Sequence, residues 1–323
     1  MSAGTHTETT VTLARLPSGV EVTTTVHTYD GVDEGPTVYV QAAQHGREVN
    51  GVEVLRRVHE RLSPRALSGR VVTVPVANPL TFDLVSYTTP EVFDSVNPNM
   101  NRVWPGSKTG SLHERMAATL WSFVEEADAV VDLHTGSPDM YPHVVFPAGN
   151  DDSRRMAEAF GTDLLLAEHA GDEAPTEWHR RGFAGKLRVA AVDAGIPAIT
   201  PELAHSRVID ESAVELGVDG LFDVFRHLDV LEGSAPTHDQ TVARNHLGQV
   251  SASASGLFRP KPSLELGSYV PEGVALGTVF DPTTFETLHD AATDREGILY
   301  ALTREATVNE GDKLASVALL DTD

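Results

Sequence analysis

The sequence predicts an α/β protein with a mixed sheet flanked by helices, followed by a smaller all-β sandwich domain. Through the first two thirds of the 323 residues, short apolar runs rich in β-branched residues alternate with amphipathic stretches. This pattern is typical of strands and helices interleaved around a mainly parallel or mixed sheet. After Leu231, helical periodicity gives way to short strands punctuated by Gly and Pro. The chain is long enough for one large core and one smaller core.

The spacing of apolar residues predicts the individual elements. Val54, Leu55, Val58 and Leu62, for example, recur at helical spacing. The same periodicity predicts helices over residues 51–62, 112–126, 183–194 and 213–228. Runs of apolar and β-branched residues predict strands at residues 37–42, 70–76, 129–133, 143–146 and 197–200.

Residues 232–239, Glu-Gly-Ser-Ala-Pro-Thr-His-Asp, have the composition of a linker. We therefore expect a large domain over residues 1–235 and a small β domain over 236–323. The small domain contains two similar turn phrases, Val-Pro-Glu-Gly at 270–273 and Val-Asn-Glu-Gly at 308–311. Matching halves of one β-sandwich and two unrelated hairpin turns are both compatible with these phrases.

Composition excludes several classes of partner and site. The formal net charge of -23 disfavours nucleic acid and anionic membrane surfaces, because both would repel the protein. No apolar run reaches the roughly 20 residues of a membrane span, and the N-terminus is polar where a signal peptide would be basic and then apolar. We therefore expect a cytoplasmic protein. The chain has no cysteine, so any metal must be bound by imidazole and carboxylate groups.

Only four of the 24 basic residues are lysine, against 47 acidic residues. This balance is expected of a surface that stays hydrated in concentrated salt. A high-GC genome that favours Arg codons explains it equally well, so a salt-loving source remains one of two interpretations.

The first chemical signal is Gln-His-Gly-Arg-Glu at residues 44–48, between a predicted strand and a predicted helix. Loops at the carboxyl ends of strands are where α/β proteins build their sites. His45 and Glu48, with Gly46 allowing a sharp turn, can direct an imidazole and a carboxylate at one metal ion. Taken alone, a His and a Glu at this spacing also occur by chance on exposed helix faces.

A second signal, Asp-Leu-His-Thr-Gly at residues 132–136, ends another apolar strand. His134 would complete a set of two His and one Glu, the three ligands of a catalytic zinc with one open position. Asp132 projects from the same face of the strand and can orient a ligand or, alternatively, cap a neighbouring turn.

A third signal is the carboxylate of Glu202, which follows the strand predicted at 197–200. Beside a metal and partly dehydrated, it could take a proton from water and pass it to a leaving amine. An N-cap or surface carboxylate is the alternative that the local sequence favours.

Together the phrases His-Gly-x-Glu, Asp-x-His-Thr and Pro-x-x-Thr-x-Glu-Leu, in this order, resemble the aspartoacylase and succinylglutamate desuccinylase family of zinc carboxypeptidase-like hydrolases. The resemblance extends into the small domain, at Leu-Phe-Arg-Pro (257–260) and Glu-Gly-Asp-Lys-Leu (310–314). It implies a zinc carboxypeptidase-like fold, one zinc ion per chain bound by His45, Glu48 and His134, and Glu202 as general base and acid.

A fourth phrase, Asn-Arg-Val-Trp-Pro-Gly at residues 101–106, is similar to the family's Asn-Arg-x-Phe-Pro-Gly. The resemblance implies that Asn101 and Arg102 bind a carboxylate of the substrate. A planar guanidinium suits this role, because it can donate two parallel hydrogen bonds to a carboxylate. A structural Arg paired with one of the many acids is the alternative.

Two departures from the family pattern concern the substrate. Relatives usually carry a further Arg before Asn101, but residues 78–100 contain none. Zinc and a neutral donor such as Tyr87 would then have to stabilise the developing oxyanion. The sequence after Glu202 continues Leu-Ala-His where many relatives have glycines, so His205 is a further candidate for a polar contact.

The small domain resembles the β-sandwich of biotin and lipoyl carriers, but it lacks an exposed lysine at a hairpin tip. Lys261 lies between prolines and Lys313 follows a Gly-Asp turn. We therefore expect this domain to shape the cleft or to form an oligomer contact rather than to act as a carrier.

These observations predict an amidohydrolase that removes the acyl group from a small, carboxylate-bearing N-acyl amino acid or related amide. Water activated by zinc would attack the carbonyl, with Glu202 transferring the proton. The salt argument and the family together suggest an N-acetylated diamino acid of compatible-solute breakdown as one example. The alternatives are a metallocarboxypeptidase on short peptides and a non-catalytic metal- or ligand-binding relative. The presence of all four central residues, His45, Glu48, His134 and Glu202, argues against the non-catalytic relative. The acyl group, the amine, the physiological metal and homo-oligomer formation stay open.

Overall fold

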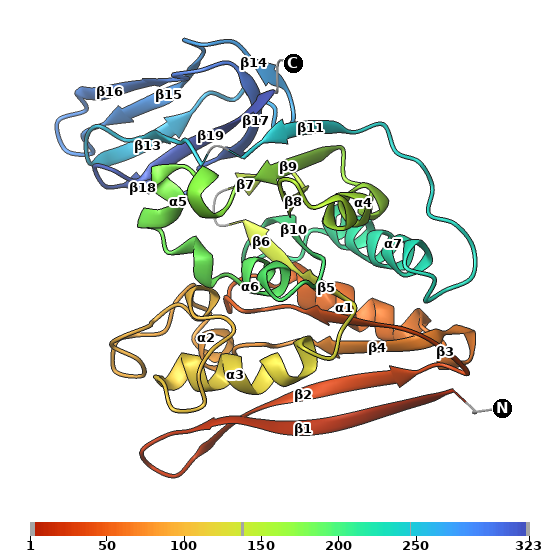
Figure 1. The fold of residues 1–323 in the computed structure, drawn as a ribbon. Helices are drawn as coiled ribbons and strands as arrows, with labels where there is room; N and C mark the ends of the chain where they lie inside the picture. Colours follow the sequence, from red (N-terminus) through yellow and green to blue (C-terminus); the bar gives the residue numbers. More distant parts are fainter. Residues whose placement is uncertain (1–3, 137–138, 246, 321–323) are drawn as a thin grey trace.

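The computed structural model describes residues 4–136, 139–245 and 247–320 and is built around a large mixed sheet (Figure 1). Its strands lie in the spatial order β1 (Thr5–Arg15), β2 (Glu21–Asp30), β4 (Ser68–Val74), β3 (Asp33–Gln41), β5 (Ala129–Asp132), β10 (Ala198–His205), β8 (His143–Pro147), β9 (Leu164–Glu168) and β11 (Thr241–Arg244). β3, β4 and β5 are parallel, as are β5 and β10, whereas β1 with β2, β2 with β4, and β10 with β8 are antiparallel. The sheet is therefore mixed, as predicted.

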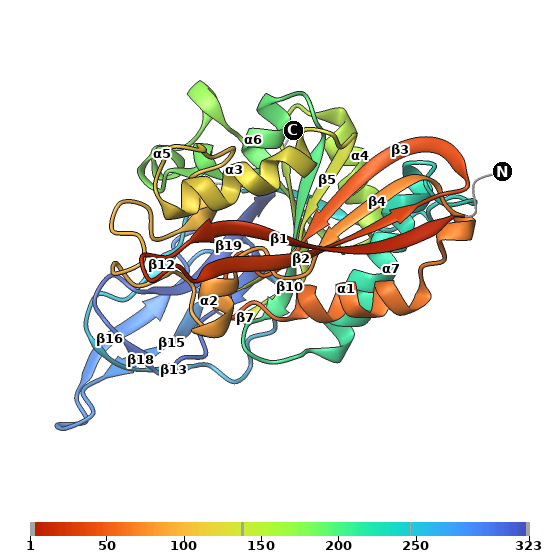
Figure 2. The same ribbon diagram turned by 90° about the horizontal axis from the view of Figure 1, so that it is seen from below.

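Helices cover both faces of this sheet. One face carries α1 (Asn50–Arg61), α4 (Asp151–Phe160) and α7 (Glu211–His227), and the other carries α3 (Leu112–Val124) and α6 (Leu187–Asp193). Figure 2 shows α3 and α1 on opposite sides of the N-terminal hairpin of β1 and β2. The remaining helices are short: α2 (Pro79–Asp83), α5 (Thr176–Arg180), and the 3-10 turns η1 (Pro64–Ala66), η2 (Met100–Arg102), η3 (Gly171–Glu173) and η4 (Phe183–Gly185). Among the described residues, no helix has the length and apolar character to cross a membrane.

The C-terminal part is an antiparallel β-sandwich. One of its sheets continues the large sheet from β11 through β19 (Lys313–Leu320), β17 (Gly297–Leu302) and β14 (Tyr269–Val270), with β12 (Val250–Ser251) on β19 and β7 (Asp139–Met140) on β17. The second sheet has the order β16 (Thr287–Ala292), β15 (Ala275–Phe280), β13 (Gly256–Pro260) and β18 (Thr307–Val308). Leu299 and Leu314 from the first sheet share a core with Phe258 and Leu276 from the second. The predicted all-β sandwich is confirmed.

The two similar turn phrases adopt matching conformations. Val270 and Val308 both end two-residue strands and lie in the same core. Gly273 and Gly311 both have positive φ, at 82° and 89°, where a glycine is favoured. Each phrase leads into a long strand, which favours matching halves of the sandwich over unrelated turns.

The predicted strands and helices are present, with one exception. The single helix expected over residues 183–194 is divided into η4 and α6, because Lys186 between them is extended, with φ -74° and ψ 147°. Gly185 lies so close to Arg102 that a Cβ would be 1.9 Å from the Arg102 carbonyl oxygen. This tertiary contact overrides the local helical periodicity.

The strand order places the chemical motifs at one edge. β5 lies between β3 and β10, and all three strands are parallel. Their carboxyl ends therefore meet at the same edge of the sheet. β6 (His134–Gly136) follows β5 directly and pairs with β10, so that Glu202 lies opposite His134.

Candidate active site

Two of the predicted ligands, His45 and Glu48, lie on the loop that follows β3. Both side chains are buried, and His45 Nδ1 is 3.0 Å from Glu48 Oε1. A glycine is required between them, since a Cβ on Gly46 would lie 1.9 Å from the backbone oxygen of Thr81. Close packing of this loop against α2 fixes where the two side chains point.

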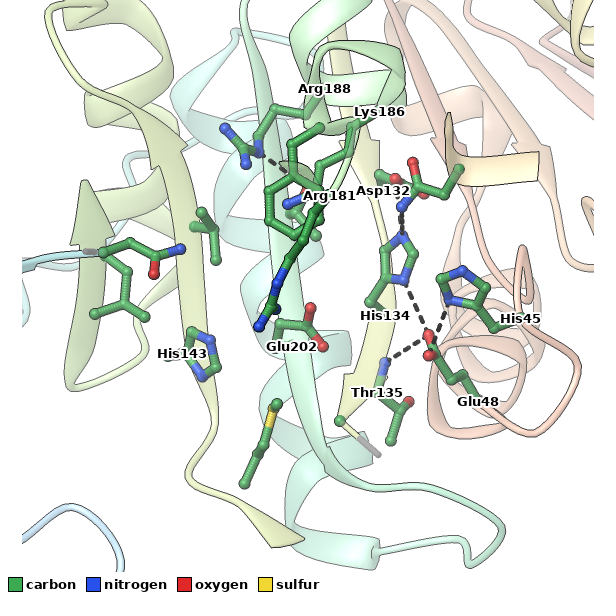
Figure 3. Close-up of a pocket in the computed structure, with 18 of the residues that line it drawn as sticks. His45, Glu48, Asp132, His134, Thr135, His143, Arg181, Lys186, Arg188 and Glu202 are labelled. Atoms are coloured by element: carbon green, nitrogen blue, oxygen red, sulfur yellow. Dashed lines mark hydrogen bonds and ion pairs between the residues drawn. The ribbon is translucent and has the colours of Figure 1, made fainter. Parts of the chain in front are cut away.

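His134, the third predicted ligand, reaches the same point from the end of β5. Its Nδ1 atom is 2.9 Å from Glu48 Oε2, and the Thr135 N–H donates to that oxygen at 3.2 Å. One ligand atom from each of His45, Glu48 and His134 lies within 4.8 Å of the other two. Figure 3 shows these three side chains turned toward one another. The predicted cluster is therefore formed in space.

The donor atoms of this cluster fit a zinc ion. Both imidazoles present Nδ1 to Glu48 and Nε2 to an oxygen acceptor: His45 Nε2 is 3.2 Å from Asn99 Oδ1, and His134 Nε2 is 2.9 Å from Asp132 Oδ2. Metal-binding histidines are commonly oriented in this way through the nitrogen that does not bind the metal. Two imidazoles and one carboxylate are a typical set for catalytic zinc.

Asp132, which orients His134, is itself held by amide groups. Gln41 Nε2 and Gln44 Nε2 donate to its carboxylate at 2.9–3.0 Å, and Trp104 Nε1 donates to Gln44 Oε1 at 2.7 Å. The buried negative charge of Asp132 is therefore well hydrogen-bonded, and its contact with Nε2 fixes the position of the His134 ring.

The two glutamates of the site have opposite pKa shifts. Burial alone would raise the pKa of Glu48, but the imidazoles of His45 and His134 hold it well below its ordinary value. Burial raises the pKa of Glu202 to about 7, with the charge of Glu48 adding to the effect and His134 opposing it. Glu202 points into the pocket between His134 and His143 (Figure 3). A carboxyl group that titrates near neutrality can both accept and donate a proton.

Asn101 and Arg102 lie on η2 and line the same pocket. Asn101 Nδ2 is 3.4 Å from His134 Nε2, and its Oδ1 accepts from the Leu187 N–H at 3.2 Å. Arg102 Nε donates to the Arg181 carbonyl at 2.7 Å, and its guanidinium lies 4.6 Å above the Phe183 ring. Arg102 Nη1 also donates to the Asn101 carbonyl oxygen at 2.5 Å. Together these contacts fix the plane of the guanidinium, which lines the pocket.

Tyr87 lines the pocket, but His205 does not. The Tyr87 ring stacks on His45 with centroids 3.9 Å apart, and burial raises the pKa of its hydroxyl, so the hydroxyl remains a hydrogen-bond donor at neutral pH. His205 pairs with Gly136 across β10 and β6, and it is absent from the described residues that surround the cavity. The structure therefore does not bring His205 together with the other predicted site residues.

Several cationic side chains in the pocket were not predicted. The cavity, of about 270 Å³, is also lined by Arg47, Arg181, Lys186, Arg188 and Lys313. Burial lowers the pKa of Lys186 and of Lys313 to about 8 in each case. Lys313 begins β19 and thus enters the pocket from the sandwich. Two of the four lysines in the chain lie here, and this rarity was the signal in the sequence that could have identified them.

His143 was not among the predicted site residues, yet it lines the pocket. Its Nδ1 is 2.8 Å from the Tyr141 carbonyl oxygen. Burial lowers its pKa to about 4, so it is a neutral imidazole beside Glu202 at pH 7.

Sequence comparisons with known proteins identify the family of this chain. Residues 34–228 match the model of the succinylglutamate desuccinylase/aspartoacylase catalytic domain. An N-alpha-acetyl-L-2,4-diaminobutyric acid deacetylase of Halomonas elongata is 29% identical over 302 residues, which cover 88% of this chain and 82% of that relative.

Solved structures share the fold along nearly the whole chain. A succinylglutamate desuccinylase/aspartoacylase from Rhodobacter sphaeroides superposes with a TM-score of 0.84 at 22% identity, covering 98% of this chain and 96% of that one. The product-bound ectoine utilization protein EutE (DoeB) from Ruegeria pomeroyi gives a TM-score of 0.84 at 22% identity, covering 99% and 96%. The matches confirm the predicted resemblance and the prediction of a hydrolytic deacylase: this chain belongs to the succinylglutamate desuccinylase/aspartoacylase family.

Proposed function

We propose that this chain is a zinc-dependent deacylase that removes the acyl group from a small N-acyl amino acid or related amide. One observation carries the proposal: the cluster of His45, Glu48 and His134 shares a pocket with Glu202, whose pKa is about 7. A metal-ligand set beside a carboxyl group that titrates near neutrality supplies the groups that metal-assisted hydrolysis of an amide uses.

His45, Glu48 and His134 would bind the zinc ion, which when bound supplies Lewis acidity and lowers the pKa of water. Glu202 takes a proton from the attacking water and returns it to the departing amine nitrogen, because its carboxyl group can hold the proton near neutral pH. Tyr87 remains protonated at this pH and can donate its O–H to the oxyanion that develops on the carbonyl.

Arg102 and Asn101 would bind the carboxylate of the substrate. Phe183 and the Arg181 carbonyl hold the Arg102 guanidinium in place, and the positive charges of Arg181, Lys186 and Lys313 surround the same cavity. A small anionic ligand is favoured by this lining and by the volume of about 270 Å³. The same features favour a free acyl amino acid over a peptide chain as the substrate.

The candidate substrate of first choice is an N-acetylated 2,4-diaminobutyric acid. The similarity to the Halomonas elongata deacetylase supports it, as does an acidic composition that suits a salt-rich interior. We further propose that residues 236–323 form a distinct domain that completes the pocket, since Lys313 belongs to β19.

A panel of N-acyl amino acids, with blocked dipeptides alongside, tests the reaction on purified protein at low and high salt. Metal analysis of the same samples gives the zinc content. Deacylation of an N-acyl amino acid with one zinc ion bound in the pocket is the expected result. Preference for the dipeptides would indicate a metallocarboxypeptidase, and bound zinc without turnover of any compound would indicate a non-catalytic relative.

The variant Glu202→Gln tests the proton transfer. We expect turnover to fall by a factor on the order of 100 or more, with unchanged zinc content, because Glu202 is not one of the clustered ligands. Glu215→Gln on the exposed face of α7 is the matched control and should retain full activity. Full turnover in Glu202→Gln would remove this residue from the mechanism.

A further inference from the structure

A second cluster of three histidines lies at the opposite end of α1 from the pocket. His6 is on β1, His27 is on β2 and His59 is in the last turn of α1. His59 follows Glu48 by most of the length of a helix that rises about 1.5 Å per residue, so this cluster is separate from the zinc ligands of the pocket. It takes no part in the proposed deacylation.

The register of the hairpin explains why these side chains meet. His6 is opposite Tyr29, and Glu8 is opposite His27, across β1 and β2. Residues that face each other across a ladder, and residues two apart along one strand, project on the same face. Tyr29 shares its core cluster with Val58 of α1, so this is the face covered by α1. His59 reaches the hairpin from the end of that helix.

The nitrogen positions suit a metal ion. His6 Nε2 is 3.2 Å from His27 Nδ1, and one nitrogen from each of the three histidines lies within 4.8 Å of the others. Two nitrogens that bind one tetrahedral zinc ion at about 2.0–2.1 Å are about 3.3 Å apart. The first pair therefore already has the required separation, and His59 needs only a small adjustment of its exposed side chain.

Neighbouring groups complete the arrangement. Tyr29 Oη is 2.8 Å from His59 Nδ1, which orients the ring and leaves Nε2 for a metal, as groups around known metal sites do. Glu8 Oε1 is 3.8 Å from His27 Nδ1 and is exposed, so either its carboxylate or water can occupy a fourth position. The imidazoles are only partly buried or exposed, and an ion can reach them from solvent.

We propose that His6, His27 and His59 form a second site for Zn²⁺, which connects the N-terminal hairpin to the end of α1. Three imidazoles favour zinc and neighbouring divalent transition ions over Mg²⁺ or Ca²⁺. Because the ligands come from three separate elements, the ion binds the folded chain more tightly than the unfolded one and stabilises it.

The test is Zn²⁺ binding to chelator-treated protein, measured by equilibrium dialysis and metal analysis in the background His134→Gln, which lacks one pocket ligand. This variant should still bind one zinc ion per chain, and adding His59→Gln should remove it. Adding His227→Gln instead, in the last turn of α7 and outside both clusters, should leave the zinc content unchanged.

Thermal unfolding gives a second measurement on the same proteins. Zn²⁺ should raise the melting temperature of His134→Gln by several degrees and should leave that of His134→Gln/His59→Gln unchanged. His59 is exposed on the helix surface, and Gln keeps a polar group beside the Tyr29 hydroxyl; the melting temperatures without Zn²⁺ show any effect of the substitution on folding itself. Equal zinc binding with and without the His59→Gln change would overturn the proposal, whatever the result for the pocket.

Discussion

Replacement of Glu168 by Gln should lower the free energy of unfolding more than the removal of a charge from any exposed side chain. Glu168 is 1% exposed and accepts hydrogen bonds from Arg188, which is 2% exposed, and from Asn245. Lys186 Nζ is 3.5 Å from the same carboxylate. The substitution leaves the buried charge of Arg188 without its counter-ion, a change that typically costs about 3–5 kcal/mol.

The pKa of Glu168 gives a similar magnitude. Burial would raise this pKa, but Arg188 and Lys186 lower it from an ordinary 4.5 to about 2. At about 1.4 kcal/mol per pH unit, the carboxylate contributes about 3 kcal/mol to the free energy of unfolding at pH 7. Because the pKa is depressed in the folded state, this contribution is complete above pH 4.5 and is lost as the pH falls toward about 2.

Urea denaturation at pH 7 measures the effect. The matched control is Glu158→Gln, which removes a carboxylate paired with Arg154 on the surface, where the two side chains are 42% and 53% exposed. The control should lose less than about 0.5 kcal/mol. If the free energy of unfolding of Glu168→Gln were within about 1 kcal/mol of the wild-type value, the ion pair between Glu168 and Arg188 would not stabilise the fold.

Three further predictions concern the pocket. Lys313→Met should raise KM for a carboxylate-bearing substrate about tenfold with less effect on kcat, whereas Lys261→Met, outside the residues that line the pocket, should change neither; equal kinetics in both variants would exclude Lys313 from binding. KM should also rise as the pH increases through about 8, where Lys186 and Lys313 lose their protons, and initial rates between pH 6 and 10 would show it; a constant KM contradicts the assignment. Asp132→Asn should weaken zinc binding about 10- to 100-fold in competition with a chelator, because Asp132 orients His134; unchanged affinity would limit Asp132 to a structural role.

The metal cluster could be predicted because its residues lie in short phrases at strand ends. Glu202 was expected after a strand that ends at residue 200, but β10 continues to His205 and Glu202 lies inside it. His45 and Glu48 are three residues apart, and His134 lies two residues after the end of β5. Parallel strands then bring these ends together without any information beyond the strand order. The cationic lining could not be predicted in this way. Lys186 belongs to no such phrase, the phrase that contains Lys313 precedes a strand of the sandwich, and the two lysines meet only through tertiary contacts.

The elements that the sequence did not predict have identifiable reasons. β1 is exposed along most of its length, so it lacks the apolar alternation that marks a half-buried strand. β2 does alternate between buried and exposed positions over its first half, but its threonines hide this pattern from a count of apolar residues. The break at Lys186 depends on the close approach of Gly185 to Arg102, which no local periodicity contains.

The strand β19 pairs with β11 of the large sheet and begins at Lys313 in the pocket. Replacing the sandwich would therefore alter both the large sheet and the lining of the pocket. Under the proposed function, a chimaera that grafts a C-terminal part without a lysine at this position onto residues 1–235 would remove one of the charges that line the pocket and would leave His45, Glu48 and His134 in place. Under the same function, Lys313 would let the sandwich alter part of the substrate preference, while Asn101, Arg102 and the residues of the hydrolytic step stay in the first segment.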